Sequence, residues 1–425
     1  MPCCALPVIR LLPRRRLAVA GLVLLCALTA SAYGAHRVLD RGKHRAYPLY
    51  TFTKNPAWFK AELDRVAVSG GTIRMPAGRV APLQLRGLTP SAPIRLVGRP
   101  KTVLTDLSIQ SSRSIVVSGL RIRPVDQPAV VDVSDSRDVT FRNVRFLGVH
   151  EDLGVALQLD PNDRNITVAD SEFTRCQHGL ACVLARGRGL TIDHVRFHDV
   201  RDADIVRGAA DDVVIRDSDL HDALPGTHGD NHNDLIQILG GGPWTIERCH
   251  FGVRANGAAQ VYVDPRAGAA GAVHDVRVTS SVFTGSNADM FFAVNVRRPA
   301  SSSVPLATGV AFVNNTIVSA NIAAIVLADQ YASVPESQRP LVGNNILGRQ
   351  KHALCDVART FTNVVVSGTG CRGDRSGDPH LDAAGRPTAA SKALLAGGTP
   401  NGAPATDRSG AKRADPPAIG AYELP

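Results

Sequence analysis

A short apolar motif recurs along most of this 425-residue chain and limits the folds that it can adopt. Each copy has apolar residues at its first, third and last positions, as in IVVSGLRI from Ile115 and LTIDHVRF from Leu190. The third position of successive copies recurs after 23 to 34 residues. It falls at Val117, Phe141, Val168, Ile192, Ile215, Ile246, Val278, Phe312 and Val342. A period in the twenties, lengthened by inserted loops, is typical of one coil of a solenoid.

A second run precedes most copies by a few residues and alternates apolar with other residues, as in ALQLD (156–160) and QVYVD (260–264). Alternation with period two indicates strands. An antiparallel sandwich is disfavoured, because no hairpin turns alternate with the strands and neighbouring repeats keep the same order. The sequence therefore predicts an all-β chain, a single parallel β-helix of about nine to eleven coils whose stacking buries a continuous core.

Both ends of the repeat region carry distinct segments. Residues 56–66 form an amphipathic pattern with Trp58, Phe59, Leu63 and Val66 on one face, which predicts a helix that caps the first coil. GGTIRMPAG follows at 70–78, and DPHLDAAGRPT…PPAIGAYE closes the chain at 378–423.

The helix, the GGTIRMPAG segment, the coils and the closing segment together resemble the pectate-lyase-like superfamily of secreted bacterial proteins. The resemblance implies a right-handed parallel β-helix over nearly the whole mature chain. It does not imply one reaction, because lyases, hydrolases, epimerases and phage depolymerases share this scaffold.

The N-terminus has the pattern of an export signal. Arg14, Arg15 and Arg16 precede an apolar run from Leu17 to Thr29, and Ala30-Ser31-Ala32 is a cleavage candidate. We expect a secreted or periplasmic protein, with an uncleaved membrane anchor as the alternative. The expected divisions are a signal or anchor at 1–34, a cap helix and first coil at 47–98, the β-helix at 99–370 and a closing segment at 371–425.

Five cysteines lie beyond the export signal, and no CxxC pair among them suggests structural zinc. Cys355 and Cys371 flank a strand-like run, so we expect a disulfide between them in an oxidising compartment. Cys176, Cys182 and Cys249 occupy apolar positions of the repeat and are expected to be buried thiols.

The formal charge of +10 favours an anionic partner, although part of it lies in the first 45 residues. Arg297 and Arg298 open a Ser/Pro-rich loop at 299–307, expected to be a groove wall or lid. No aromatic residues interleave with these arginines, which argues against nucleic acid. The sequence leaves the oligomeric state open.

The segment GTHGDNHNDLIQ at 226–237 departs most from the repeat and is an insertion directly before a strand. Alternation turns Gln237 outward, and the next coil then places Tyr262 beside it, about 4.8 Å away. Strict alignment would bury the charge of Arg207 at high cost, so we expect a one-residue slip that turns it outward beside Gln237.

The histidines and aspartates of this insertion, together with Tyr262 and the arginines, suit chemistry at the carbon next to a uronate carboxylate. Removing the proton from that carbon needs a base, an acid and a cation. His228 or His232 could be the base and Tyr262 the acid, while arginines bind carboxylates. Asp230 or Asp234 could orient a histidine or bind Ca²⁺, the only cofactor considered. The structural alternative for Asp234 is a turn cap. The predicted catalytic residues are His228, His232, Asp234, Arg254 and Tyr262, and the predicted substrate-binding residues are Arg207, Asp230, Gln237, Asp264 and Asn295.

The sequence thus favours an enzyme, a lyase or C5-epimerase of an acidic, uronate-containing polysaccharide. One alternative is a glycoside hydrolase, which would need two facing carboxylates from Asp230, Asp234, Asp204 or Asp264. The paired aspartate motifs of polygalacturonases are not recognisable. Another alternative is a non-catalytic envelope protein that binds exopolysaccharide.

Overall fold

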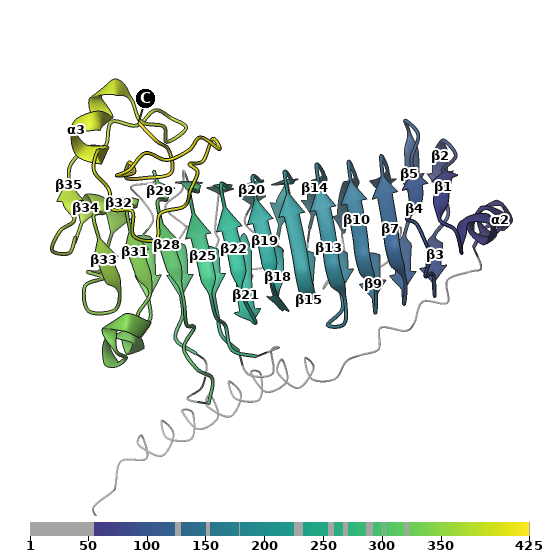
Figure 1. The fold of residues 1–425 in the computed structure, drawn as a ribbon, viewed down its shortest axis with the longest axis horizontal. Coiled ribbons are helices and arrows are strands. Elements are labelled where there is room, and N and C mark those ends of the chain that lie inside the picture. The colour runs from purple at the N-terminus through teal and green to yellow at the C-terminus, as the bar shows by residue number, and fades with distance from the viewer. Residues whose placement is uncertain are drawn as a thin grey trace, which may run out of the picture. The chain divides into compact units, whose positions relative to one another are not determined.

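The computed structural model describes residues 55–123, 129–149, 154–177, 179–224, 233–253, 259–266, 271–285, 292–299, 301, 303–318 and 323–424. These residues form stacked coils, and each coil contributes short strands to ladders that run side by side (Figure 1). Three ladders can be followed through the strand pairings, and we number them 1 to 3.

The strands of the ladders have the following bounds. Ladder 1 contains β3 (Leu83–Arg86), β6 (Leu107–Gln110), β9 (Ala129–Ser134), β12 (Val155–Leu159), the first part of β15 (Ala181–Asp193), β18 (Asp204–Asp211), β21 (Ile236–Gly240), β24 (Ala259–Val263), β27 (Phe292–Val296) and β30 (Ala323–Leu327). Ladder 2 contains β1 (Gly71–Arg74), β4 (Ile94–Val97), β7 (Arg113–Ser118), β10 (Arg137–Arg142), β13 (Arg164–Ala169), the last part of β15, β19 (Val213–Arg216), β22 (Trp244–Glu247), β25 (Val276–Thr279), β28 (Ala311–Val313), β31 (Leu341–Gly343) and β33 (Arg359–Phe361). Ladder 3 contains β2 (Gly78–Val80), β5 (Thr102–Leu104), β8 (Arg121–Ile122), β11 (Arg145–Val149), β14 (Glu172–Cys176), β16 (Arg196–His198), β17 (Val200–Arg201), β20 (Asp219–Leu224), β23 (His250–Val253), β26 (Val282–Gly285), β29 (Thr316–Ile317), β32 (Ile346–Gln350), β34 (Val364–Gly368) and β35 (Arg375–Ser376).

Each coil passes from ladder 2 to ladder 3 and then to ladder 1, as β7, β8 and β9 do. Each strand pairs in parallel with its counterparts in the neighbouring coils, for example Val139 with Ile115 and with Ile166. Among the described residues, antiparallel pairs occur only as two isolated bridges near the C-terminus. The chain is therefore a right-handed parallel β-helix, as expected, and the antiparallel sandwich is excluded.

Inward side chains of successive coils form one continuous apolar core. In ladder 3 the core contains a row of phenylalanines that are fully buried. The rings of Phe146 and Phe173 stack at 4.2 Å between centroids, and those of Phe173 and Phe197 at 4.8 Å. Stacking of identical residues is possible because the parallel register repeats the same position every coil.

The turn between ladders 2 and 3 uses one residue with positive φ followed by a buried residue that points inward. Asn314 and Asn344 have φ of 57° and 53°, a conformation that Asn tolerates better than most residues. The next residue in each of these turns, Asn315 or Asn345, is buried and hydrogen-bonds to the adjacent coils. This amide ladder satisfies backbone groups that the turn would otherwise leave without partners.

The helix α2 (Ala57–Val66) lies beside β1 at the N-terminal end of the β-helix (Figure 1). Phe59 and Val66 are fully buried, so the expected capping face is present. Trp58 was expected on the same face but is 38% exposed, because the buried stripe of this short helix is narrower than the apolar pattern.

After ladder 3 ends, the chain forms a closing segment with little regular structure. It contains the short helices η3 (Ala389–Ser391) and α3 (Lys392–Leu395), whereas η1 (Asp329–Ser333) and η2 (Glu336–Gln338) lie earlier, between β30 and β31. The closing segment packs on the turns between ladders 2 and 3, where Asn314 donates a hydrogen bond to the carbonyl of Ala418 at 2.8 Å. Arg413 is buried there and pairs with Glu423 at 2.9 Å.

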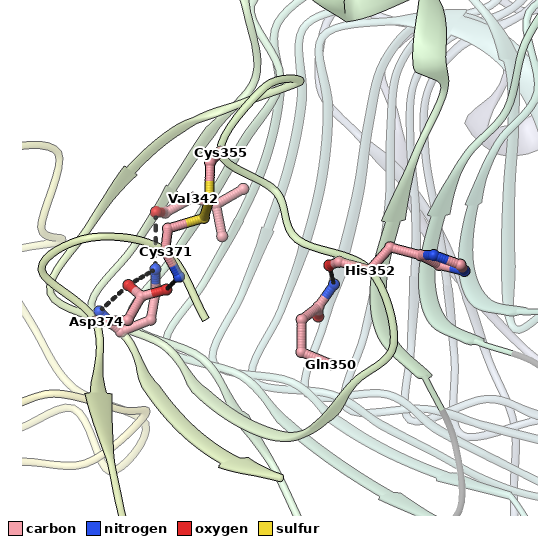
Figure 2. Close-up of a disulfide and its surroundings, with 7 residues drawn as sticks. Val342, Gln350, His352, Cys355, Cys371 and Asp374 are labelled. Carbon is pink, nitrogen blue, oxygen red and sulfur yellow. Dashed lines mark hydrogen bonds between the residues drawn. A yellow bond between two sulfur atoms is a disulfide. The ribbon is translucent and has the colours of Figure 1, made fainter. Parts of the chain in front are cut away.

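The described residues contain two disulfides. Cys355 and Cys371 form the predicted one, next to Asp374, whose carboxylate accepts a hydrogen bond from the Cys371 amide (Figure 2). Cys176 and Cys182 form the other, so the expectation of buried thiols was wrong for this pair. Their chain positions lie on either side of the corner between ladders 3 and 1, which brings their Cα atoms to 5.6 Å, within bonding range.

Cys249 is a buried free thiol, as expected, and burial raises its pKa to about 12. Two disulfides are typical of proteins from an oxidising compartment. In the part of the chain that the structure describes, no helix has the length and apolar character to cross a membrane. The predicted signal or anchor at 1–34 lies outside the described residues.

Candidate functional site

Four polar side chains lie in register on the outer face of ladder 1. Arg207 pairs with Gln237, Gln237 with Tyr262, and Tyr262 with Asn295 in successive coils. The neighbouring residues of these strands, such as Ile236 and Val261, are fully buried in the core, so strand alternation turns the four outward. The expected adjacency of Gln237 and Tyr262 is confirmed, as is the outward slip of Arg207.

Asp264 connects this row to two further arginines. It follows β24 directly and is 1% exposed. Its carboxylate accepts a hydrogen bond from Arg266 Nε at 2.6 Å and a longer one from Gln237 Nε2 at 3.5 Å. Arg297 Nη1 lies 4.0 Å from its other oxygen. Neither arginine was predicted as a site residue, because each lies just beyond a ladder-1 strand, where the repeat pattern no longer sets its direction.

Tyr262 is 5% exposed, and its hydroxyl accepts a hydrogen bond from Arg297 Nη1 at 3.0 Å. Burial raises the pKa of Tyr262, and the nearby charge of Asp264 raises it further, while Arg297 acts in the opposite direction. The net shift is upward, so the phenol stays protonated at neutral pH. The Arg297 side chain remains 55% exposed and can still contact a ligand.

Asp204 and Asp234 act as caps at the start of ladder-1 strands. Asp204 Oδ1 accepts a hydrogen bond from the amide of Asp234 at 2.9 Å, and Asp234 Oδ1 accepts one from the amide of Ala259 at 2.9 Å. Asp204 Oδ2 also accepts a hydrogen bond from Arg207 Nη1 at 3.0 Å. Asp234 is fully buried, and these contacts match the structural alternative that the sequence left open for it.

Four predicted site residues, His228, Asp230, His232 and Arg254, lie outside the described residues. Their roles therefore stay predictions. Asn295 lies in the outer row next to Tyr262 and is partly exposed, whereas two other predicted substrate-binding residues are buried, Gln237 at 0% and Asp264 at 1% exposed.

Metal binding was considered for Asp230 and Asp234. Among the described residues, one group of three could hold a metal ion, because the ligand atoms of Asp193, His194 and Asp217 all lie within 4.8 Å of one another. It lies at the turns between ladders 2 and 3. Arg216 pairs with Asp193 at 2.8 Å and Arg248 with Asp217 at 2.8 Å, so both carboxylates already have cationic partners.

A row of histidines on the outer face of ladder 3 was missed at the level of sequence. Each is hydrogen-bonded to a carboxylate, and the rings of His198 and His221 stack at 5.7 Å. The pairs are His198 with Glu172 at 2.6 Å, His221 with Asp222 at 2.9 Å and His250 with Asp219 at 2.7 Å. A signal was present, since RFH, DLH and CHF place each histidine beside the inward residue of its motif.

A hydrogen-bond chain connects this row to ladder 1. His250 Nε2 lies 2.9 Å from the Thr284 hydroxyl, and Gln260, two residues before Tyr262, donates to the Thr284 carbonyl at 2.7 Å. Burial raises the pKa of Asp219, but its hydrogen bond with His250 and neighbouring positive charges outweigh this and lower it overall. Asp219 therefore stays ionised at neutral pH beside His250.

No family model matches the chain, and no curated protein matches it either. Several solved structures are similar. A PL6 family polysaccharide lyase from Pseudopedobacter saltans matches with a TM-score of 0.39 and 14% identity over 79% of this chain and 97% of the lyase. The A-module of the Azotobacter vinelandii mannuronan C-5 epimerase AlgE6 matches with a TM-score of 0.36 and 14% identity over 63% and 92%.

A tailspike protein of the E. coli bacteriophage HK620 matches with a TM-score of 0.48 and 15% identity over 76% of this chain and 63% of the tailspike. At such identities these similarities concern the fold alone, which the parallel pairing of the strands already establishes.

Proposed function

We propose that the chain acts on an acidic, uronate-containing polysaccharide at the outer face of ladder 1, by β-elimination or C5 epimerisation. The observation that carries the proposal is the contact of the Tyr262 hydroxyl with Arg297, beside the buried Asp264. It combines a proton-carrying group with a partly exposed cation, which are two of the three groups that this chemistry needs.

Both reactions begin with removal of the proton from the carbon next to the uronate carboxylate. Negative charge then moves onto the carboxylate, and a fixed cation lowers the energy of that state. Arg297 is 55% exposed and Arg266 is 30% exposed, so both guanidinium groups can reach a sugar carboxylate. Asp264 holds Arg266 through a charge-assisted hydrogen bond, which fixes the direction of the guanidinium.

Tyr262 is proposed as the acid. Because its pKa is raised, its phenol carries a proton at neutral pH and can donate it to the leaving oxygen in β-elimination. In epimerisation the base would keep the proton removed from the carbon, and Tyr262 would donate its phenol proton to that carbon from the opposite face. The base is proposed to be His232 or His228, in the insertion that precedes Asn233 and β21 in the chain.

The test is incubation of the purified protein with alginate, pectate and glycosaminoglycans. A lyase produces an unsaturated sugar that absorbs in the ultraviolet, and an epimerase incorporates deuterium from D₂O without a new double bond. We expect Tyr262→Phe to lower turnover by about 10²- to 10⁴-fold, because the fold remains and the proton donor is lost. His232→Ala should have a similar effect.

His274→Ala is the matched control, since the side chain of His274 is 43% exposed, hydrogen-bonds to its neighbour Asp275, and precedes β25 of ladder 2. It should leave turnover unchanged. Activity on a neutral glycan that survives both Tyr262→Phe and His232→Ala would refute the proposal, as would the lack of any activity on polyuronates. Binding without turnover would instead support the non-catalytic alternative.

The cellular location is also a proposal at this level of detail. We take the protein to be secreted or periplasmic, with the apolar segment from Leu17 to Thr29 as its export signal or as an uncleaved anchor. N-terminal sequencing of the mature protein distinguishes the two.

A further inference from the structure

The first coils of the β-helix carry a large excess of positive charge. Residues 67–123 contain eight arginines and one lysine but a single acidic residue, Asp106. Asp106 is 6% exposed, and burial raises its pKa to about 7, so it is only partly ionised at neutral pH. The charges of the preceding helix α2 balance one another, because each of its two basic residues pairs with an acidic residue of the same helix. The excess charge therefore belongs to the coils.

Five of the nine cations lie on or beside the outer face of ladder 3. Arg79 of β2 and Arg121 of β8 occupy one register row, with Val103 of β5 between them. The next residues of these strands, Val80 and Ile122, are buried in the core, so strand alternation turns the two arginines outward. Three further cations precede β5 or follow β8. We call the five residues the basic strip: Arg79, Arg99, Lys101, Arg121 and Arg123.

The side chains of the basic strip are exposed, and none of them has a hydrogen bond or an ion pair among the described residues. The strip ends one coil further on, where Arg145 pairs in register with Arg121 but forms an ion pair with Glu172 at 3.0 Å. Beyond this point acidic and basic residues alternate along the row, since Glu172 pairs with Arg196 and Arg196 with Asp219. The unbalanced charge on ladder 3 is therefore confined to its first three coils.

The arrangement of these cations indicates the kind of partner. Each of three successive coils contributes at least one cation, and coils are about 4.8 Å apart, so an anion that repeats along a polymer meets a cation at every coil. Guanidinium groups bind carboxylates through paired hydrogen bonds. Residues 67–123 contain no aromatic side chain on which a nucleic-acid base could stack. Like charges on neighbouring strands repel one another, and a bound polyanion would remove part of that repulsion.

We propose that the basic strip is a second binding site for the acidic polysaccharide, which holds the polymer on ladder 3 while ladder 1 acts on it. The inference rests on the proposed function for the identity of the polymer. From Arg121 to β23, the strand before Tyr262 in the chain, ladder 3 advances by five coils, or about 24 Å. A long polymer can reach both surfaces and gains affinity from the second contact, whereas a tetrasaccharide bound at Tyr262 is too short to do so.

The experiment removes three cations of the basic strip together, in the triple variant Arg79→Gln, Arg121→Gln and Arg123→Gln. Its affinity for polymeric alginate is measured by isothermal titration calorimetry with Tyr262→Phe added to prevent turnover. We expect the affinity to fall about tenfold relative to Tyr262→Phe alone, and the loss to shrink at high salt, because exposed charge contacts are screened. With Tyr262 intact, the KM and kcat for alginate tetrasaccharide should stay within about twofold of wild type.

The matched control is a second triple variant, Arg349→Gln, Lys351→Gln and Arg372→Gln. It removes three exposed cations of the C-terminal coils that likewise have no ion pair among the described residues, so the net charge changes equally. Its affinity for polymeric alginate should stay within about twofold of the background. Circular dichroism should show both triple variants folded, since all six side chains are exposed or lie at the surface of short strands and turns.

The possible failures can be told apart. Equal losses of affinity in the two triple variants, or no loss in either, would overturn the basic strip as a site, and turnover by wild type would leave the proposed function standing. Strip-dependent binding of alginate without turnover of any polyuronate would sink the proposed function and keep the strip. Strip-dependent binding to phosphatidylglycerol vesicles, with alginate affinity unchanged, would show that the strip contacts lipid and overturn the inference.

Discussion

The amide ladder between ladders 2 and 3 gives a quantitative test of how the coils hold together. Asn345 is fully buried and makes four hydrogen bonds with its side chain. Its Oδ1 accepts from the amide of Asn315 at 2.9 Å and from Asn315 Nδ2 at 3.1 Å. Its Nδ2 donates to the Phe312 carbonyl at 2.8 Å and to Asn363 Oδ1 at 3.1 Å. Asn345→Ala removes all four and leaves partners on two neighbouring coils buried.

At about 1 kcal/mol for each hydrogen bond, Asn345→Ala should lower the free energy of unfolding by about 4 kcal/mol. Urea unfolding followed by circular dichroism measures this loss, and hydrogen exchange should show it first in the C-terminal coils, because each coil contacts only its neighbours. Asn401→Ala, at an exposed position, is the control and should stay within about 0.5 kcal/mol of wild type. A loss below about 1 kcal/mol for Asn345→Ala would refute the reasoning, since the amide would then contribute nothing beyond its volume.

Three further predictions concern the disulfide, the core and a partly buried acid. The double change Cys355→Ser with Cys371→Ser opens a disulfide with a sequence separation of 16 and should lower the free energy of unfolding by about 3 kcal/mol under oxidising conditions; no change between reduced and oxidised wild type would contradict this. Phe173→Ala should lower the free energy of unfolding in urea by about 3–5 kcal/mol, because the ring is fully buried between two other phenylalanine rings. An equal loss for Val366→Ala, at an exposed position, would show that the stacked phenylalanines contribute no more than a surface residue. Asp132 has a pKa of about 6 in the folded protein, above its usual 3.8. The stability that its protonated form contributes to folding is therefore complete at low pH and is lost as the pH rises through about 6. Asp132→Asn should therefore gain up to about 3 kcal/mol relative to wild type between pH 4 and pH 7.5, and a constant difference across that range of melting curves would argue against the shift.

The repeat period was sufficient to predict the β-helix and the neighbours along ladder 1. A parallel ladder keeps the same register in every coil, so Gln237 and Tyr262 could be paired from strand alternation alone. The same logic placed Arg207 outward, once the cost of a buried charge was included. The left-handed turn positions of Asn314 and Asn344 also follow from the residue type.

Contacts made at the corners between ladders could not be predicted in this way. The disulfide of Cys176 and Cys182 depends on the angle at which the chain turns from ladder 3 to ladder 1, and the repeat does not encode that angle. Arg266 and Arg297 lie just after ladder-1 strands, where period two ends, so their meeting with Asp264 and Tyr262 is visible only in three dimensions.

The histidines of ladder 3 were missed at the level of sequence for a different reason. His198 and His221 stack on neighbouring coils of ladder 3, and His250 of the next coil pairs in register with Asp219, two residues from His221; their distances in the sequence hide that all three lie on this ladder. Aligning every outward position of each coil, rather than searching for local clusters, would have found them. The insertion at 226–237 was predicted as a site because its polar residues are close in sequence. In a solenoid this is a weaker criterion than outward positions that successive coils share.

The most direct test of where the polysaccharide binds is a crystal structure of the Tyr262→Phe variant with an oligouronate bound. We expect a sugar carboxylate in contact with Arg297 or Arg266, and a sugar ring over the position of the missing Tyr262 hydroxyl. An oligosaccharide bound along ladder 2 or ladder 3, with the outer face of ladder 1 left free, would contradict it.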